Sequence, residues 1–229
     1  MDGVGEPDRR ADREDLELDA LPGNAAKIRL LLDLAERRPA RVLDVGCGDL
    51  SLWAALKDRP RVVGVDAHLP PPAVEGIETQ QVDARALPFH EEFDAVVSTQ
   101  MLDDVREWRE VLRRMREALR PGGTLYLTCD SGDSPRPLRQ RLKRVPPGPP
   151  LDELGEAAAA VGLDVEVLRR YGRRDLKAQQ RFLDGPARLA TFELEETLDA
   201  VDPREWRLLY LRATRPAARS RPAARAHSG

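Results

Sequence analysis

The chain has 229 residues, 41% of them hydrophobic and 34% charged, which is enough apolar material for the core of one large domain. No apolar run approaches the ~20 residues of a membrane-spanning helix. With 37 Lys and Arg against 40 Asp and Glu, the net charge of -3 argues against a protein that coats nucleic acid. Two cysteines do not make a disulfide scaffold, and the polar N-terminus lacks the apolar core of a secretory signal, so we expect a cytoplasmic protein.

The two ends of the chain differ in composition from its middle. Residues 1–22 are polar and rich in acids, and residues 214–229 form a basic tail of Ala, Arg and Pro. Neither segment has enough apolar surface to offset the entropy lost on ordering. The sequence therefore predicts disordered arms on either side of one domain at residues 23–213.

The middle of the chain alternates short apolar runs with helix-periodic segments. The apolar runs predict strands at 41–45, 61–65, 77–82, 93–98, 124–129, 163–168 and 206–213. Helical periodicity predicts helices at 25–38, 50–57, 108–119, 152–161 and 186–200. Short apolar strands separated by helices indicate an α/β fold with a doubly wound, mostly parallel sheet.

A glycine-containing turn follows the first predicted strand. Gly46-Cys47-Gly48 lets the backbone approach a ligand closely, although a plain strand-to-helix turn is the alternative for this motif alone. The second strand ends in Asp66, from which a carboxylate can bind both hydroxyls of an adenosine ribose. The third strand ends in Asp83. This spacing favours an adenosine-containing ligand at the carboxyl edge of the sheet.

Five segments resemble the class I methyltransferases that use S-adenosylmethionine, in particular the small-molecule subgroup. They are VLDVGCG, VVGVDAH, QVDARALPF, FDAVVSTQMLDDV and LRPGGTLYLT, in that family's order and spacing, and the likeness is strong over residues 41–128. The resemblance implies a Rossmann-like seven-stranded sheet with six parallel strands and an antiparallel last strand. It also implies S-adenosyl-L-methionine as cofactor and S-adenosyl-L-homocysteine as product.

The resemblance assigns the methionine end of the cofactor to the first strand and its turn. Gly46, Cys47 and Gly48 would flank the methionine part, and Asp44 would help to hold its ammonium. Leu50 stands where the family commonly has a third glycine, which is a departure from the pattern.

The adenosine end is assigned to the next two strands. The resemblance implies that Asp66 binds the ribose diol and that Ala67 and His68 lie near the adenine. Asp83 and Ala84 would face the exocyclic amine of the adenine. Gln100, just past the fourth strand, would close the floor of the site.

The charge of the predicted strand ends favours the same cofactor. Acids stand at these positions: Asp44, Asp49, Asp66, Asp83, Asp103, Asp104 and Asp130. Such a rim repels a pyrophosphate unless a helix N-terminus and cations outweigh it, whereas S-adenosylmethionine has no phosphate and carries a cationic ammonium and sulfonium. An NAD(P)-binding Rossmann oxidoreductase remains the alternative enzyme.

The sequence does not single out a catalytic residue. Methyl transfer is an in-line displacement that mainly requires alignment and the exclusion of water, and a base is needed only for weak nucleophiles. Asp103, Asp104 and Asp130 are candidates for that base, ahead of His68 and Tyr171. Asp103-Asp104 occupies a place where many relatives have an acid-His pair.

The acceptor is expected to be a small molecule with an O or N nucleophile. The chain lacks the Asn/Asp-Pro-Pro-Tyr/Phe motif associated with base methylation in nucleic acids. Residues 131–150 and 171–203 follow the fifth and sixth strands and are interpreted as substrate caps. The basic run at 136–144 leaves RNA open as a partner, with a solvated loop as the alternative.

The sequence also argues against a metal site and against a non-catalytic role. Three dispersed histidines and no Cys-x-x-Cys motif predict no metal site. A non-catalytic methyltransferase-like binding module is the alternative from another class. It is disfavoured because a decayed site has no reason to keep Gly46, Gly48, Asp66 and Asp83.

Overall fold

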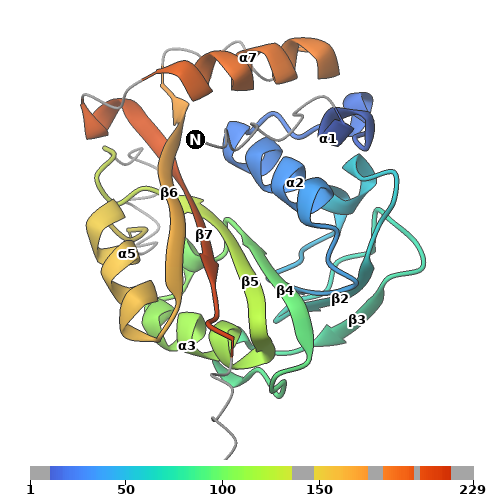
Figure 1. Cartoon of the computed structure of the whole chain (residues 1–229), viewed down its shortest axis with the longest axis vertical. Helices are drawn as coiled ribbons and strands as arrows, with labels where there is room; N and C mark the ends of the chain where they lie inside the picture. Colours follow the sequence, from blue (N-terminus) through green and yellow to red (C-terminus); the bar gives the residue numbers. More distant parts are fainter. Residues whose placement is uncertain (1–10, 136–146, 175–182, 199–201, 218–229) are drawn as a thin grey trace, which may run out of the picture.

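The computed structural model describes residues 11–135, 147–174, 183–198 and 202–217. A seven-stranded sheet with the order β3-β2-β1-β4-β5-β7-β6 forms the centre of the molecule (Figure 1). The strands are β1 (Arg41–Val45), β2 (Arg61–Asp66), β3 (Glu78–Gln81), β4 (Phe93–Thr99), β5 (Leu119–Asp130), β6 (Asp164–Arg173) and β7 (Trp206–Thr214). Strands β1 to β5 pair in parallel, and β7 is antiparallel to both β5 and β6. This confirms the predicted mostly parallel sheet with a reversed last strand.

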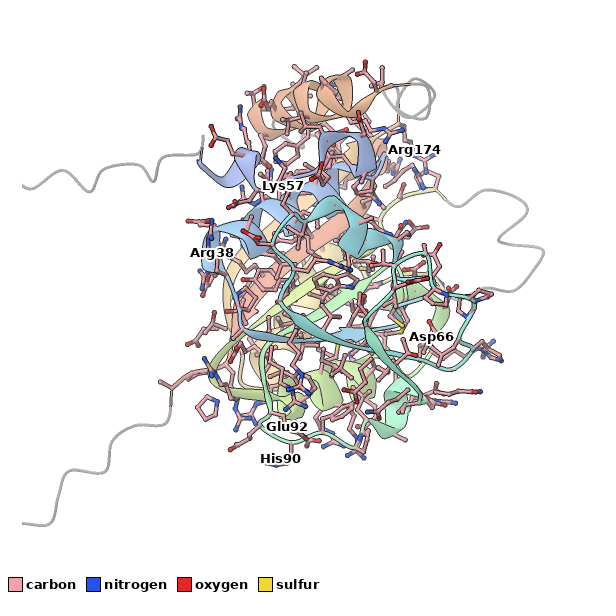
Figure 2. All side chains as sticks on the ribbon, turned by 90° about the vertical axis from the view of Figure 1, so that its right-hand side faces the viewer. Arg38, Lys57, Asp66, His90, Glu92 and Arg174 are labelled. Atoms are coloured by element: carbon pink, nitrogen blue, oxygen red, sulfur yellow. The ribbon has the colours of Figure 1, made fainter. Side chains whose placement is uncertain are left out.

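The longer helices cover both faces of the sheet. They are α2 (Ala25–Arg37), α3 (Trp108–Ala118), α5 (Leu151–Ala160) and α7 (Gly185–Thr197). Helices α3 and α5 share one hydrophobic cluster with alternate residues of the central strands, and α2 and α7 share the other. Figures 1 and 2 show α7 beside α2 at the top of the molecule. The α2 face carries the side chains that matter most for the site described below.

Several predicted elements have different bounds in the structure, such as the fifth strand, which begins at Leu119 instead of residue 124. Two of the differences have a clear physical cause. The helix expected at 50–57 is a short 3-10 helix, η2 (Ser51–Ala55), because Leu50 is left-handed and Leu56 is extended where it bridges to Leu16. The sixth strand, expected to end at 168, continues to Arg173 because β7 pairs along its whole length. The arginines in this late part of β6, Arg169, Arg170 and Arg173, are half-buried in spite of their charge.

The described parts of the two predicted arms are ordered, which corrects the expectation of disorder there. Leu16 and Leu21 are buried, and Leu16 forms a β-bridge with Leu56. At the other end β7 runs to Thr214, and the guanidinium of Arg215 donates to the carbonyl of Leu119. The few apolar residues of the acidic segment therefore suffice to anchor it, since both leucines fill the α2-face cluster. Residues 1–10 and 218–229 lie outside the described part of the chain.

None of the helices in the described ranges combines the length and the apolar character that a membrane crossing requires.

Candidate functional site

The predicted site residues meet at the carboxyl edge of the sheet. Strand β1 is followed in the chain by β2 on one side of it, and β4 is later added on its other side. The boundary between β1 and β4 is therefore the topological switch point, the place where α/β sheets bind ligands. Helix α2 ends at Arg37, just before β1 begins, so its N-terminus lies at the same edge as the end of β1. Figure 2 shows Asp66 and Arg174 on the right, at this edge, and Arg38 on the opposite side.

The two glycines after β1 have different physical roles. Both take positive φ values, 74° at Gly46 and 53° at Gly48. A Cβ on Gly46 would lie 2.5 Å from Cγ of Met101, so this glycine allows the turn after β4 to pack against the loop. A Cβ on Gly48 would meet nothing within 4 Å. Gly48 therefore faces open space, as a backbone that contacts a ligand must.

Leu50, the departure from the family pattern, takes a left-handed backbone conformation of the kind that favours glycine. Its φ is 64° and its ψ is 12°, which is strained for a residue with a side chain. The side chain is buried at 1% exposure and lies against Gly64 of β2. Burial of the leucine offsets the strain, so the loop keeps its geometry without the third glycine.

Asp66 ties the end of β2 to the glycine loop. Its Oδ2 accepts a hydrogen bond from the Gly48 N–H at 3.0 Å, and its Oδ1 accepts from the His68 N–H at 2.9 Å. Each carboxylate oxygen has a second lone pair, so both can still accept a ribose hydroxyl. Ala67 and His68 are exposed beside it, and the Ala67 carbonyl accepts from the Gln81 amide.

The carboxylate of Asp83 already has a cationic partner. Arg85 donates to both of its oxygens, with Nη2 at 2.6 Å from Oδ2. These hydrogen bonds lower the pKa of Asp83 to about 2. Asp83 also caps the short helix that begins at Ala84. An adenine amine would therefore have to share this carboxylate with Arg85.

Asp44 is a buried carboxylate, and one of its oxygens has no hydrogen-bond partner. It is 2% exposed, and its Oδ2 accepts from the indole N–H of Trp53 at 2.7 Å. Its Oδ1 is buried without a hydrogen-bond partner, which is unusual because buried polar atoms are nearly always paired. Burial raises the pKa of Asp44 to about 6. An ammonium donating to Oδ1 would complete this site.

Lys27 is a further charged residue near this edge, and no sequence motif marks it. Lys27 lies in the first turn of α2, and its backbone N–H is capped by Asn24. Burial lowers its pKa, while Asp44 and Asp49 act in the opposite direction. Its place at the start of α2 becomes known only from the fold, because the helix carries no motif that points to a ligand. Trp53 is buried, and its indole N–H donates to Asp44.

The turn after β4 brings a second group of acids to the edge. Gln100 has a φ of 56°, and its N–H donates to the Thr128 carbonyl at 2.7 Å. The Asp130 N–H donates to Oδ1 of Asp103 at 3.3 Å. Burial and the charge of Asp130 raise the pKa of Asp103 to about 6, and the pKa of the more exposed Asp104 is also raised.

Tyr171 is not available as a base, which corrects one of the sequence candidates. It lies within β6, is fully buried, stacks on Phe192 and donates to Glu196. Burial raises its pKa far above the physiological range. His68 is exposed in the turn after Asp66.

The cysteines do not form a disulfide. Cys47 and Cys129 are both free thiols. Burial raises the pKa of Cys47 to about 12, so it is not a nucleophile. Within the described ranges no group of three or more His, Cys, Asp or Glu side chains is arranged to hold a metal ion.

This geometry can be compared with known proteins. A methyltransferase-domain family model matches residues 20–179, which is more than half of the chain. The chain belongs to the class I methyltransferases. This family uses S-adenosylmethionine, in agreement with the acidic edge, the open carboxylate oxygen of Asp44 and the exposed backbone at Gly48.

Individual relatives of this methyltransferase cover only part of it. It is 33% identical over 116 residues to malonyl-[acyl-carrier protein] O-methyltransferase of Pseudescherichia vulneris, which is 46% of this chain and 45% of the relative. It is 33% identical over 100 residues to a ubiquinone biosynthesis O-methyltransferase of Pseudomonas fluorescens, which is 38% of this chain and 43% of the relative. The chain thus matches less than half the length of these two relatives.

A solved structure shows the same fold at lower identity. The 1,6-didemethyltoxoflavin-N1-methyltransferase of Burkholderia thailandensis, solved with its substrate and S-adenosylhomocysteine, superposes with a TM-score of 0.57 at 19% identity. The superposition covers 91% of this methyltransferase and 80% of that protein. At this identity the likeness establishes the fold and leaves the acceptor open.

Proposed function

We propose that this protein is a cytoplasmic enzyme that transfers the methyl group of S-adenosylmethionine to an O or N nucleophile of a small molecule. The observation that carries the proposal is the pair of carboxylates at the switch point. Asp44 has a buried oxygen without a partner, and Asp66 is fixed to the Gly48 N–H with lone pairs to spare. The relatives named above, two O-methyltransferases and one N-methyltransferase, support an O or N acceptor.

In this proposal, side chains of opposite charge hold the ammonium and the carboxylate of the methionine part, and a further carboxylate holds the ribose. Asp44 accepts from the ammonium, and Lys27 together with the N-terminus of α2 attracts the carboxylate of the methionine part. Asp66 accepts from the ribose hydroxyls, and the segment from Ala67 to Ala84 lies along the adenine. The bound cofactor supplies an electrophilic methyl on a sulfonium, so the protein's task is to align the acceptor behind that methyl and to exclude water.

We propose that the segment between β5 and α5 covers the acceptor. Its two described ends are joined by a hydrogen bond from the Gly132 N–H to the Pro149 carbonyl at 2.9 Å. Asp133 pairs with Arg170 of β6 at 2.7 Å and fixes this neck to the sheet. We propose this covering role for the whole of residues 131–150.

The other insert, residues 171–203, differs, because its described helix α7 is a packed part of the core with Phe192 buried. The basic run at 136–144 lies outside the described residues.

The test is calorimetric binding followed by a methyl-transfer screen. We expect S-adenosylhomocysteine to bind and NAD not to bind, and we expect transfer from labelled S-adenosylmethionine to a component of a pool of small metabolites. Binding of NAD alone would favour the oxidoreductase alternative. Binding of S-adenosylhomocysteine without transfer to metabolites or RNA would favour the non-catalytic module. Transfer to RNA, with binding that weakens steeply with salt, would replace the small-molecule acceptor.

A further inference from the structure

Three buried polar atoms without partners gather at one edge of the sheet. They are Oδ1 of Asp44, Oγ1 of Thr128 and Oδ1 of Asp130. Thr128 is fully buried and stands two residues before Asp130 on β5, so their side chains point to the same face. Strand β4, between β1 and β5, pairs with both. Because orphaned polar atoms are rare in protein interiors, their grouping indicates that a polar ligand completes this region.

Asp103 and Asp130 form the acidic part of that region. The backbone N–H of Asp130 donates to Oδ1 of Asp103, which holds the Asp103 carboxylate against the main chain of Asp130. No cation pairs with Asp103, Asp104 or Asp130 among the described residues, although most arginines in the described ranges have a carboxylate partner. Uncompensated negative charge of this kind attracts a cation.

The neck of the loop after β5 packs against the half-buried Asp103 and Asp130. A Cβ on Gly148 would collide with the Asp130 carbonyl oxygen and would lie 3.5 Å from Cβ of Asp103. The backbone of Gly148 thus lies against the main chain of Asp130 and close to the Asp103 side chain. A charge interaction in such a sheltered place is screened less than one on the open surface.

The pair also lies next to the place expected for the cofactor sulfur. Met101, two residues before Asp103, packs against Gly46 of the methionine-binding loop. The ribose, if held by Asp66, extends toward β2, away from β4 and β5. The cofactor sulfur joins the methionine part to the ribose. With the ribose on the β2 side of the loop, the charge and the methyl group of the sulfonium face the β4–β5 side.

We infer that Asp103 and Asp130 face the sulfonium and make this site prefer S-adenosylmethionine to its demethylated product. The inference rests on the proposed function. On transfer, the carbon–sulfur bond breaks and sulfur keeps the electron pair, while the acceptor forms a bond to the methyl carbon and loses its proton to water. The sulfur is then neutral, so the attraction to the two acids disappears and the product leaves more readily.

The experiment compares three ligands by calorimetry in the full chain. The ligands are S-adenosylmethionine, neutral S-adenosylhomocysteine, and sinefungin, which carries an amine near the position of the methyl. We expect Asp103→Asn to reduce the preference for the two charged ligands over S-adenosylhomocysteine by roughly ten-fold, with little change in S-adenosylhomocysteine affinity. Asp58→Asn, which removes the same charge from an exposed position between η2 and β2, should leave the preference unchanged.

The outcomes separate this inference from the proposed function. Unchanged preference in a folded Asp103→Asn protein that still binds S-adenosylhomocysteine would overturn the inference alone, and the pair would then serve the acceptor. Failure of the unmodified protein to bind any of the three ligands would overturn both. If Asp103→Asn does not fold, Asp130→Asn carries the same expectation and the same decision.

Discussion

At the scale of single residues, Asp66 is the sharpest test of how the adenosine end is held. A hydroxyl donating to a carboxylate is a charge-assisted bond worth roughly 1.5–3 kcal/mol. Asp66→Ala should therefore weaken S-adenosylhomocysteine binding by about 10- to 100-fold, measured by titration. Asp66→Asn keeps an oxygen for the Gly48 N–H and separates loss of the loop contact from loss of the charge. An unchanged dissociation constant in a folded Asp66→Ala protein would show that the ribose lies elsewhere.

Asp44 leads to a prediction about pH. Its folded pKa of about 6 lies above the ordinary value of 3.8, so between these values the folded chain binds more protons than the unfolded chain. The free energy of unfolding should therefore fall as pH rises from about 4 to about 6, by up to about 3 kcal/mol from this group, and level off above that.

The measurement is urea unfolding of the ligand-free protein at pH 4.5 and pH 7. Asp103 has a raised pKa in the same range and contributes to the slope of the unmodified chain. Asp44→Asn removes the Asp44 part, so its loss of stability between the two pH values should be smaller. Equal losses in the two proteins would mean that Asp44 stays ionised in the fold.

At the scale of elements, the loop between β5 and α5 can be tested without disturbing its neck. Replacing residues 136–146 by a short Gly/Ser linker keeps the Gly132–Pro149 hydrogen bond and the Asp133–Arg170 pair. If the loop covers the acceptor, S-adenosylhomocysteine affinity should stay within about three-fold, whereas methyl transfer to the acceptor found in the screen should fall by more than about ten-fold. Equal turnover in the two proteins would remove the covering role.

At the scale of the whole molecule, the acidic N-terminal segment belongs to the folded domain. Leu16 is 2% exposed and bridges to Leu56, so Leu16→Ala should lower the free energy of unfolding by about 2–5 kcal/mol in urea. Glu17→Ala, at an exposed neighbouring position, should change it by less than about 0.5 kcal/mol. A small effect at Leu16 would restore the expectation of a disordered arm.

The sequence by itself determined the sheet, the identity of its edge and the family. Strands such as β1 and β4 are mostly apolar because both of their faces are buried, and this pattern is readable without tertiary information. The sequence predicts that Gly46, Gly48 and Asp66 lie at one site, because the carboxyl ends of parallel strands meet at the same edge of a sheet.

Only the tertiary structure decided what those residues contact. The pairing of Asp44 with Trp53, of Asp83 with Arg85 and of Asp103 with the Asp130 N–H depends on side-chain directions in space, which no periodicity encodes. The burial of Leu16 also depends on the tertiary structure. Two leucines among acids are typical of a solvated segment, and only the surface formed by α2 and η2 provides a place to bury them. Burial, and with it the raised pKa values of Asp44 and Asp103, is a property of the neighbours that folding brings together.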